Sequence, residues 1–382
     1  MHFFDYNATT PLLPESREAW LEAADTSWLN PSSPYRAAAE VHVRLESARE
    51  GIAGILGVLP ERLIFNSGAT EGNNAIFAYW AESLPSAVKI GVSPTEHPSV
   101  LEAAKRYFGS RVVWLALDST GAINLKHLAE LVESKVIAAV SVMAANNETG
   151  ILNPWQAIAE ICHQASCWYH CDASQWLGKM PSLELGKCDF LTGCAHKFGG
   201  PTGVGFCVLP SVNSSFSSLV GGVQELGRRA GTEDVPGVLA LYAALKCATE
   251  HLPESQSGMD DFLISIRRAL PELQVVGLEA PRLWNTVSLL MPEFMSVRWV
   301  RGLERRGFLV SSGSACSTGK VGGSHVLAAM GYESGAVSRV LRISSGRATH
   351  EAEWRGLAAA VIATYEELKE GAAGSTSRVI SI

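Results

Sequence analysis

The sequence predicts an α/β protein with a mostly parallel central sheet covered by helices, followed by a smaller α+β domain. Between about residues 60 and 210, short apolar segments alternate with helical patterns, which is typical of parallel sheets with helices on both faces. A polar run at residues 253–258 then breaks the helical pattern. We therefore expect a large domain at 15–254 and a small domain built from 1–14 and 255–382.

Each expected element is a short apolar run or a helical pattern between turn-forming residues. The large domain is expected to contain, in chain order, strand 63–65, helix 70–81, strand 88–92, helix 100–108, strand 112–115, helix 125–132, strand 136–142, helix 155–162, strand 167–171 and helix 235–251. The small domain is expected to contain strands at 286–290, 308–311 and 340–344. Ligands of such sheets bind where strands end and loops begin.

The composition is that of an ordinary soluble protein. The 382 residues are 47% hydrophobic and 18% charged, with a net charge of -7. There is no long Lys/Arg run and no apolar run near the ~18 residues of a membrane span, so we expect no nucleic-acid or membrane partner. The N-terminus lacks the pattern of a secretory signal, and the eight cysteines lack disulfide-framework spacing. We expect a cytoplasmic protein.

The most informative residues are a lysine on a Gly-rich turn and an aspartate after an apolar segment. Lys197 lies in the run Cys-Ala-His-Lys-Phe-Gly-Gly, about two dozen residues after Asp172. A lysine can form a Schiff base with an aldehyde cofactor, and an aspartate can hold a pyridinium nitrogen. Together they indicate pyridoxal 5′-phosphate (PLP), although a lysine alone is most often a solvated surface charge.

Four further segments carry candidate cofactor contacts. The Gly-rich helix start containing Ala69 and Thr70 could bind a phosphate, and taken alone it reads better as a plain helix cap. His97 follows a strand and could stack on a flat ring, where the alternative is a structural histidine. Asn147 could reach the phenolic oxygen of the ring or contact the substrate, where the alternative is a turn former. Gln175 could also reach the phenolic oxygen, where the alternative is a solvated amide.

Three residues are candidates for phosphate, sulfur and carboxylate chemistry. His196, beside Lys197, could reach the phosphate or share proton transfer, or it supports the structure. Cys316 lies in the small-residue run Ser-Ser-Gly-Ser-Ala-Cys-Ser-Thr-Gly, which suits a nucleophilic thiol better than a buried one. Arg342 lies on an apolar strand and could bind the carboxylate of an amino-acid substrate, or it forms an internal salt bridge.

A cluster of sulfur and imidazole groups raises the alternative of a zinc site. Its spacing contains no C-x₂-C pair, and its residues straddle a helix end and a strand, so we expect no metal. The cluster consists of Cys162, His163, Cys167, His170 and Cys171.

These motifs, in this order, resemble the cysteine desulfurases, a class V aminotransferase branch of the fold-type I PLP-dependent enzymes. The resemblance runs from Asp5 to Arg347. Its motifs are Asp5–Pro11, Asn30–Ser33, Ser67–Glu71, Asn147–Gly150, Asp172–Gln175, His196–Lys197, Arg229–Thr232 and Ser311–Cys316.

The resemblance implies a role for each matching residue. Lys197 would hold PLP, Asp172 would bind its ring nitrogen, His97 would stack on the ring, and Gln175 and Asn147 would meet its phenolic oxygen. The phosphate would be bound by Ala69, Thr70, Cys194 and His196, and by Thr232 of a neighbouring subunit, which implies a homodimer. Arg342, with Asn30, would bind the carboxylate of L-cysteine, and Cys316 would take its sulfur as a persulfide.

Some positions depart from the family pattern. Cys194 stands where the family has a serine that contacts the phosphate, and a thiol is the weaker donor. Thr202, Tyr35 and Val223 also replace common family residues. None of these changes removes a reacting group, so they concern the preferred sulfur acceptor more than the chemistry.

The sequence therefore predicts a cysteine desulfurase that converts L-cysteine into L-alanine and passes persulfide sulfur to an acceptor protein. That acceptor would be an iron–sulfur scaffold or a sulfur carrier for thiolated cofactors and tRNA. One alternative is a selenocysteine lyase or another class V aminotransferase-type enzyme. Another is a scaffold that has lost its catalytic activity and binds a partner protein.

Overall fold

The chain divides into two compact units in the computed structural model. The large unit consists of Thr9–Asn146 and Leu152–Leu252, and the small unit of Met1–Ala8, Asn147–Ile151 and Pro253–Ile382. The sequence did not predict that residues 9–14 belong to the large unit or residues 147–151 to the small one. The structure describes residues 1–211, 215–253, 257–312 and 323–376.

The large unit is built on a seven-stranded sheet in the order β2-β8-β7-β6-β5-β3-β4. The five strands from β7 to β4 are parallel, and β8 pairs antiparallel with both β2 and β7. The strands are β2 Leu63–Asn66, β3 Lys89–Val92, β4 Val112–Trp114, β5 Ile137–Ser141, β6 Trp168–Asp172, β7 Phe190–Cys194 and β8 Gly205–Val208. The mostly parallel sheet predicted from the sequence is thus confirmed.

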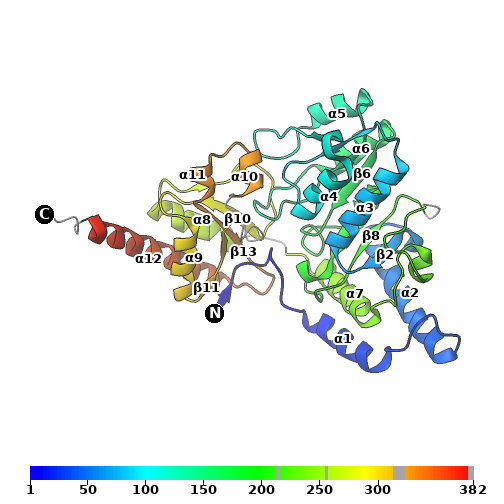
Figure 1. Ribbon diagram of the computed structural model, residues 1–382. Coiled ribbons are helices and arrows are strands. Elements are labelled where there is room, and N and C mark those ends of the chain that lie inside the picture. The colour runs from blue at the N-terminus through cyan, green and yellow to red at the C-terminus, as the bar shows by residue number, and fades with distance from the viewer. Residues whose placement is uncertain (212–214, 254–256, 313–322, 377–382) are drawn as a thin grey trace. The chain divides into compact units, whose positions relative to one another are not determined.

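The helices of the large unit pack against one another in three groups. α7 packs against both α1 and α2 (Figure 1), α3 packs against α4, and α5 against α6. The helices are α1 Pro14–Thr26, α2 Arg36–Leu56, α3 Ala69–Ser83, α4 Pro98–Phe108, α5 Leu125–Glu133, α6 Trp155–Gln164 and α7 Val235–Glu250. Short 3₁₀ turns occur at Pro60–Arg62, Gly109–Arg111, Leu183–Lys187, Ala195–Lys197 and Gln224–Gly227.

The small unit contains a four-stranded antiparallel sheet and a two-stranded parallel one. Their orders are β12-β13-β10-β9 and β1-β11. The strands are β1 His2–Phe3, β9 Gln274–Val275, β10 Thr286–Leu290, β11 Phe308–Leu309, β12 Ser311–Ser312 and β13 Val340–Ser344.

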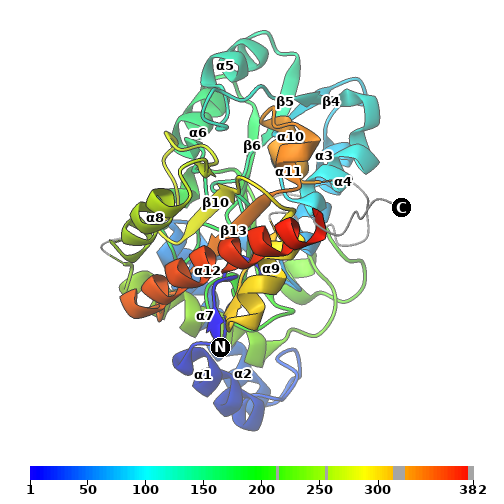
Figure 2. The same ribbon diagram turned by 90° about the vertical axis from the view of Figure 1, so that its left-hand side faces the viewer.

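Helices of the small unit enclose a core that includes the buried side chains of Phe262, Trp299 and Leu341. The long helix α12 packs against α8 and α9, as Figure 2 shows. The helices are α8 Ser257–Ala269, α9 Ser296–Arg305, α10 His325–Ala329, α11 Ser334–Val337 and α12 Glu351–Thr376. In the part of the chain that the structure describes, no helix combines the length and apolar character needed to cross a bilayer.

A tight turn follows β7, and the segment that leads into α1 braces it. The amide of Thr10 donates to the carbonyl of His196 at 2.9 Å, and the amide of Leu13 donates to the carbonyl of Gly199 at 2.9 Å. Gly199 has φ +94°, and a Cβ atom added there would lie 2.3 Å from Cγ of Leu13. A side chain at this position would therefore push the bracing segment away from the turn.

We expect Gly199→Ala to destabilise the protein more than Gly203→Ala. Gly203 also has a positive φ, +81°, but no atom lies within 4 Å of an added Cβ. Backbone strain of about 1–3 kcal/mol applies to both variants, whereas Gly199→Ala adds a steric cost of about 1–3 kcal/mol. Urea unfolding of both variants measures the difference, and equal losses of stability would show that Leu13 does not press on the turn.

Candidate active site

Asp172 ends strand β6 and is a buried carboxylate with a hydrogen bond to each oxygen. Only 6% of the residue is exposed. The side-chain amide of Asn73 donates to Oδ2 at 3.0 Å, and the backbone amide of Ser174 donates to Oδ1 at 2.9 Å. Because a buried charge needs hydrogen-bond partners, these two donors fix how the carboxylate is oriented.

Lys197 lies close to the same edge of the sheet as Asp172. Strands β6 and β7 are parallel neighbours in which Asp172 pairs with Thr192, and the turn carrying Lys197 directly follows β7. The thiol of Cys194, which ends β7, experiences both charges. Burial raises the pKa of this thiol, the ammonium of Lys197 lowers it, and the carboxylate of Asp172 raises it further. The lysine and the aspartate therefore act on one shared side chain.

The first turn of α3 lies beside Cys194. Its N-cap residue, Gly68, provides no side-chain hydrogen bond, and the amide of Ala69 bonds to the thiol of Cys194. Thr70 is exposed at the surface. The amides of a first helical turn and the helix dipole favour an anion. A phosphate group would suit this position.

Two histidines lie on the loops that flank this edge. His97 is the N-cap residue of α4, and its Nδ1 accepts a hydrogen bond from the amide of Ser99 at 3.2 Å. Burial, followed by the charges of Lys197 and His97, lowers the pKa of His196 to about 4. His196 is therefore neutral near pH 7.

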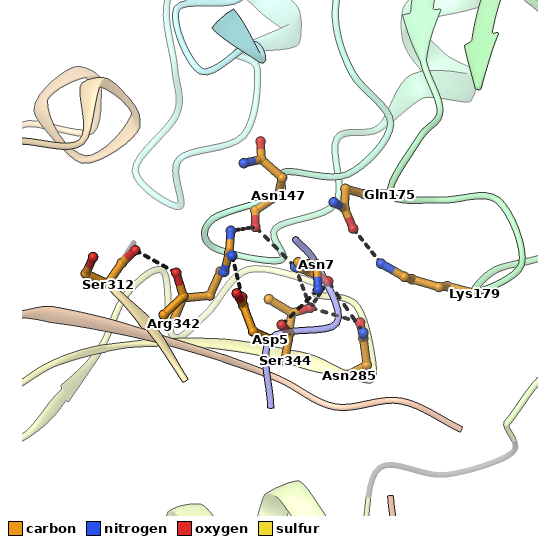
Figure 3. A network of polar contacts seen from close by, with 11 residues as sticks. Asp5, Asn7, Asn147, Gln175, Lys179, Asn285, Ser312, Arg342 and Ser344 are labelled. Atoms are coloured by element: carbon orange, nitrogen blue, oxygen red, sulfur yellow. Dashed lines mark hydrogen bonds and ion pairs between the residues drawn. The ribbon is translucent and has the colours of Figure 1, made fainter. Parts of the chain in front are cut away.

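Gln175 is buried and is oriented by a lysine one helical turn later. Nζ of Lys179 donates to Oε1 of Gln175 at 2.5 Å, as Figure 3 shows. Because a lysine can only donate, the amide atom of Gln175 that faces Lys179 must be the oxygen. The amide nitrogen is thereby assigned as a donor, which is the group that a phenolic oxygen requires.

Glu96 is a buried acidic residue that the sequence did not single out. It is fully buried, and its Oε1 accepts from the amide of Met143 at 2.5 Å. Burial raises the pKa of Glu96 well above its ordinary value, and the charge of Asp172 raises it further. Burial and the nearby carboxylate of Asp172 thus both favour the protonated form of Glu96.

In the small unit, Arg342 forms an internal ion pair. Its Nη2 lies 2.6 Å from Oδ1 of Asp5, and its Nη1 donates to the backbone carbonyl of Asn147 at 3.0 Å (Figure 3). Nε of Arg342 is buried and has no hydrogen-bond partner in the described part of the chain. The internal salt bridge that the sequence left open is thus present, and the guanidinium has donor capacity left for a carboxylate.

Glu148 follows Asn147 in the same segment of the small unit. Its Oε2 accepts from the hydroxyl of Ser324 at 2.5 Å, and that hydroxyl accepts from the amide of Leu327 at the start of α10. Burial raises the pKa of Glu148 to about 7, although Ser324 and the charge of Arg342 oppose the shift. The carboxyl group is therefore half protonated near neutral pH.

Asn30 and Thr232 are predicted site residues of the large unit, and both are exposed. Asn30 is exposed, and its side-chain oxygen accepts from the amide of Ser32 at 2.9 Å. Thr232 is exposed and lines a cavity of about 200 Å³ together with Ser67 and Arg229. Cys316 lies outside the residues that the structure describes.

Sequence reasoning missed the residues that hold the predicted ones. Asn73, Ser174 and Lys179 each hydrogen-bond directly to a predicted cofactor residue. Asn73 lies three residues after Thr70 on α3, a helical spacing that could have drawn attention to it. Within the described ranges, no group of three or more His, Cys, Asp or Glu side chains is arranged to hold a metal ion.

The chemistry of these residues fits PLP. Asp172 offers a buried carboxylate to a pyridinium nitrogen, Lys197 offers an amine to an aldehyde, and the start of α3 offers amides to a phosphate. Gln175 contributes an oriented amide donor. Each polar group of the cofactor would thus meet a group of opposite hydrogen-bonding character.

Comparison with known proteins agrees with this chemistry. A family model described as aminotransferase class-V matches residues 2–355. A cysteine desulfurase of Klebsiella pneumoniae is 36% identical, over 92% of this chain and 89% of that protein. Cysteine desulfurase 2 of Trichormus variabilis is 35% identical, over 92% of this chain and 89% of that protein. A solved NifS-like protein is 31% identical with a TM-score of 0.86, covering 96% of this chain and 99% of that one.

The raised pKa of Glu148 predicts how stability depends on pH. Between its ordinary pKa of 4.5 and about 7, the folded protein binds more protons at this site than the unfolded chain, so stability falls as pH rises through this window. Glu148→Gln cannot ionise. From pH 5 to pH 8, the variant should gain about 2.5 kcal/mol of unfolding free energy relative to the natural protein.

Urea unfolding of both proteins at the two pH values tests this expectation. Other titrating groups cancel in the difference between the two proteins. Glu333→Gln, at an exposed position of the same unit, is the matched control and should show no such change. A stability difference between Glu148→Gln and the natural protein that stays constant with pH would contradict the prediction.

Proposed function

The chain belongs to the class-V aminotransferase family and, within it, to the cysteine desulfurases, and from this we propose that it uses PLP to remove sulfur from L-cysteine. Members of these families are PLP-dependent. The products would be L-alanine and a persulfide on Cys316. The observation that carries the proposal is that Asp172 ends β6 while Lys197 lies on the turn that directly follows β7, the parallel neighbour of β6.

Residues of the large unit would each contact a different chemical group of the cofactor. When bound, PLP supplies an electron sink for bond changes at the substrate amine and its neighbouring carbons. Asp172 would hold the ring nitrogen, His97 would stack on the ring, and Gln175 would donate to the phenolic oxygen. Lys197 would bond to the aldehyde carbon and, once displaced by the substrate amine, would move the proton at the substrate Cα.

The phosphate would be held at the start of α3. Ala69 and Thr70 would donate from the first helical turn, and Cys194 and His196 would contact the phosphate from the turn after β7. A hydroxyl from Thr232 of a second subunit would complete this set. The protein would therefore act as a homodimer.

Sulfur transfer requires a nucleophile that is separate from these cofactor contacts. The Cys316 thiolate would attack the sulfur of L-cysteine and form an S–S bond. The bond between that sulfur and the substrate Cβ would break, and its electron pair would go to Cβ, which takes up a proton to give alanine. The persulfide on Cys316 would then pass its outer sulfur to an acceptor protein, for iron–sulfur clusters or for thiolated cofactors and tRNA.

The substrate carboxylate would be recognised by Arg342, with Asn30 and Asn147 contributing hydrogen bonds. The buried Nε–H of Arg342 supports this role because it lacks a hydrogen-bond partner in the described residues. Asp5 keeps the guanidinium in place at 2.6 Å. A planar guanidinium held in this way is suited to a carboxylate.

Incubation of the purified protein with PLP and L-cysteine should yield equal amounts of alanine and sulfide in the presence of a reducing thiol. Lys197→Ala should abolish turnover, because the amine that bonds to the aldehyde is gone. Cys316→Ser should also abolish cysteine turnover, because no thiol remains to accept the sulfur. Mass spectrometry of the peptide containing Cys316 should detect one added sulfur atom after a single turnover.

Three outcomes would redirect the proposal. Full cysteine turnover by Cys316→Ser would show that this thiol is not the acceptor. If both the natural protein and Cys316→Ser turn over selenocysteine and neither uses cysteine, the protein is a selenocysteine lyase. A protein that neither binds PLP nor changes its absorption spectrum with it would be a scaffold.

Cys194→Ser should bind PLP more tightly than the natural protein. A hydroxyl is a stronger hydrogen-bond donor than a thiol, so the phosphate should gain up to about 1.4 kcal/mol, or roughly tenfold in affinity. Quenching of tryptophan fluorescence during PLP titration measures the dissociation constant. Cys247→Ser, on helix α7, is the matched control, and an unchanged affinity in Cys194→Ser would remove Cys194 from the phosphate contacts.

A further inference from the structure

A continuous series of buried and half-buried polar side chains links Asp172 to His97 within the large unit. Asn73 stands at its centre and is itself fully buried. Each neighbouring pair in the series lies within hydrogen-bond distance, between 2.7 and 3.2 Å. The series runs through Ser141, His170, Thr192, Asn73, Ser99 and His97, and Asp172 joins it as a second partner of the Asn73 amide nitrogen.

The carboxylate of Asp172 determines how the amide of Asn73 is oriented. An ionised carboxylate can only accept, so the amide nitrogen of Asn73 must face Oδ2 of Asp172 at 3.0 Å. The amide oxygen then faces Thr192, whose hydroxyl donates to it at 2.7 Å. The second N–H of Asn73 donates to Oγ of Ser99 at 2.9 Å, so both N–H groups and the amide oxygen have partners.

The proton positions of His170 follow from Thr192. The single hydroxyl proton of Thr192 goes to Asn73, so its oxygen must accept from Nε2 of His170 at 3.2 Å. Burial lowers the pKa of His170 to about 4, so the ring carries one proton at neutral pH. Nδ1 is then an acceptor, and Ser141 donates to it at 2.9 Å. Hydrogen bonds from Ser141 to His170, from His170 to Thr192 and from Thr192 to Asn73 therefore all run in one direction and fix the orientation of the Asn73 amide.

The proton position of His97 follows from the hydrogen bond that Asn73 donates to Ser99. Oγ of Ser99 accepts from Asn73, which leaves its hydroxyl proton for Nδ1 of His97 at 2.8 Å. The backbone amide of Ser99 also donates to that nitrogen, at 3.2 Å. Nδ1 of His97 therefore accepts, and the ring proton lies on Nε2.

We propose that Asn73 is a positioning residue that fixes both the orientation of the Asp172 carboxylate and the tautomer of His97. The inference rests on the proposed function, in which these two side chains contact the ring nitrogen and the ring face of PLP. The buried amide of Asn73 thereby supports two contacts with the same cofactor, one made by Asp172 and one made by His97. No other residue of the series hydrogen-bonds to Asp172 and to the Ser99–His97 pair at once.

The test compares PLP with its 1-deaza analogue, in which a carbon atom replaces the ring nitrogen. The natural protein should bind PLP at least about tenfold more tightly than the analogue, because Asp172 has no partner in the analogue. In Asn73→Ala, affinity for PLP should fall about tenfold while affinity for the analogue changes little. Simple damage to the fold would weaken both to the same extent.

Two further variants make the comparison decisive. Asn74→Ala is the matched control, since the side chain of Asn74 donates to the carbonyl of Thr70 within its own helix, at 2.9 Å. The ratio of its affinities for PLP and the analogue should equal that of the natural protein. Thr192→Val keeps the side-chain volume but removes the donor that orients Asn73, so it should reduce the preference for PLP several-fold. If Asn73→Ala does not fold, the affinities of Thr192→Val for PLP and for the analogue test the inference instead.

The tautomer of His97 is measured on the PLP-free protein by ¹⁵N NMR of labelled histidines, with His97→Gln identifying its signals. The natural protein should show a single Nε2–H form, and Asn73→Ala should show a mixture of both forms. An unchanged tautomer, or an unchanged preference for PLP in both Asn73→Ala and Thr192→Val, would overturn the inference. If the natural protein itself does not distinguish PLP from the analogue, the proposed role of Asp172 fails instead.

Discussion

The candidate site depends on keeping one carboxylate ionised inside the protein. A buried charge without partners costs several kcal/mol, and Asp172 is nearly inaccessible to water. Asn73 from α3 and the backbone of Ser174 after β6 supply the two hydrogen bonds that make this tolerable. Burial and the charge of Asp172 both raise the pKa of the neighbouring acid, Glu96, which favours its uncharged form. The placement of α3 against β6 and β7 is therefore as important to the site as the aspartate itself.

Much of the fold could be predicted because parallel strands buried on both faces leave a strong local signal. Strands β10 and β13 coincide residue for residue with the predicted segments 286–290 and 340–344. β7 was not predicted, since its sequence Phe-Leu-Thr-Gly-Cys is short and interrupted by glycine. The assignment of residues 147–151 to the small unit also left no local signal. It depends on distant pairings, such as the amide of Leu283 with the carbonyl of Gly150.

Sequence reasoning singled out candidate reactive residues and missed the residues that hydrogen-bond to them. Lys197, Asp172 and His97 stand out because each follows a strand in a recognisable motif. Asn73 and Thr192 do not, because their hydrogen bonds join residues 99 and 119 positions apart in the chain. A single sequence reveals which groups can react, whereas the pairing of distant polar groups becomes visible only when the chain is folded. Arg342 shows the same limit, since its partner Asp5 lies 337 positions away.

The interleaving of the two units has a practical consequence for anyone who wishes to study them separately. A recombinant fragment spanning 9–252 would still carry Asn147–Ile151, which belong to the other unit. In that fragment Gly150 would lose Leu283, and the carbonyl of Asn147 would lose Arg342 and Asn7. Terminal truncation therefore cannot isolate either half cleanly, and dissection would require replacing this short internal stretch with an unrelated linker.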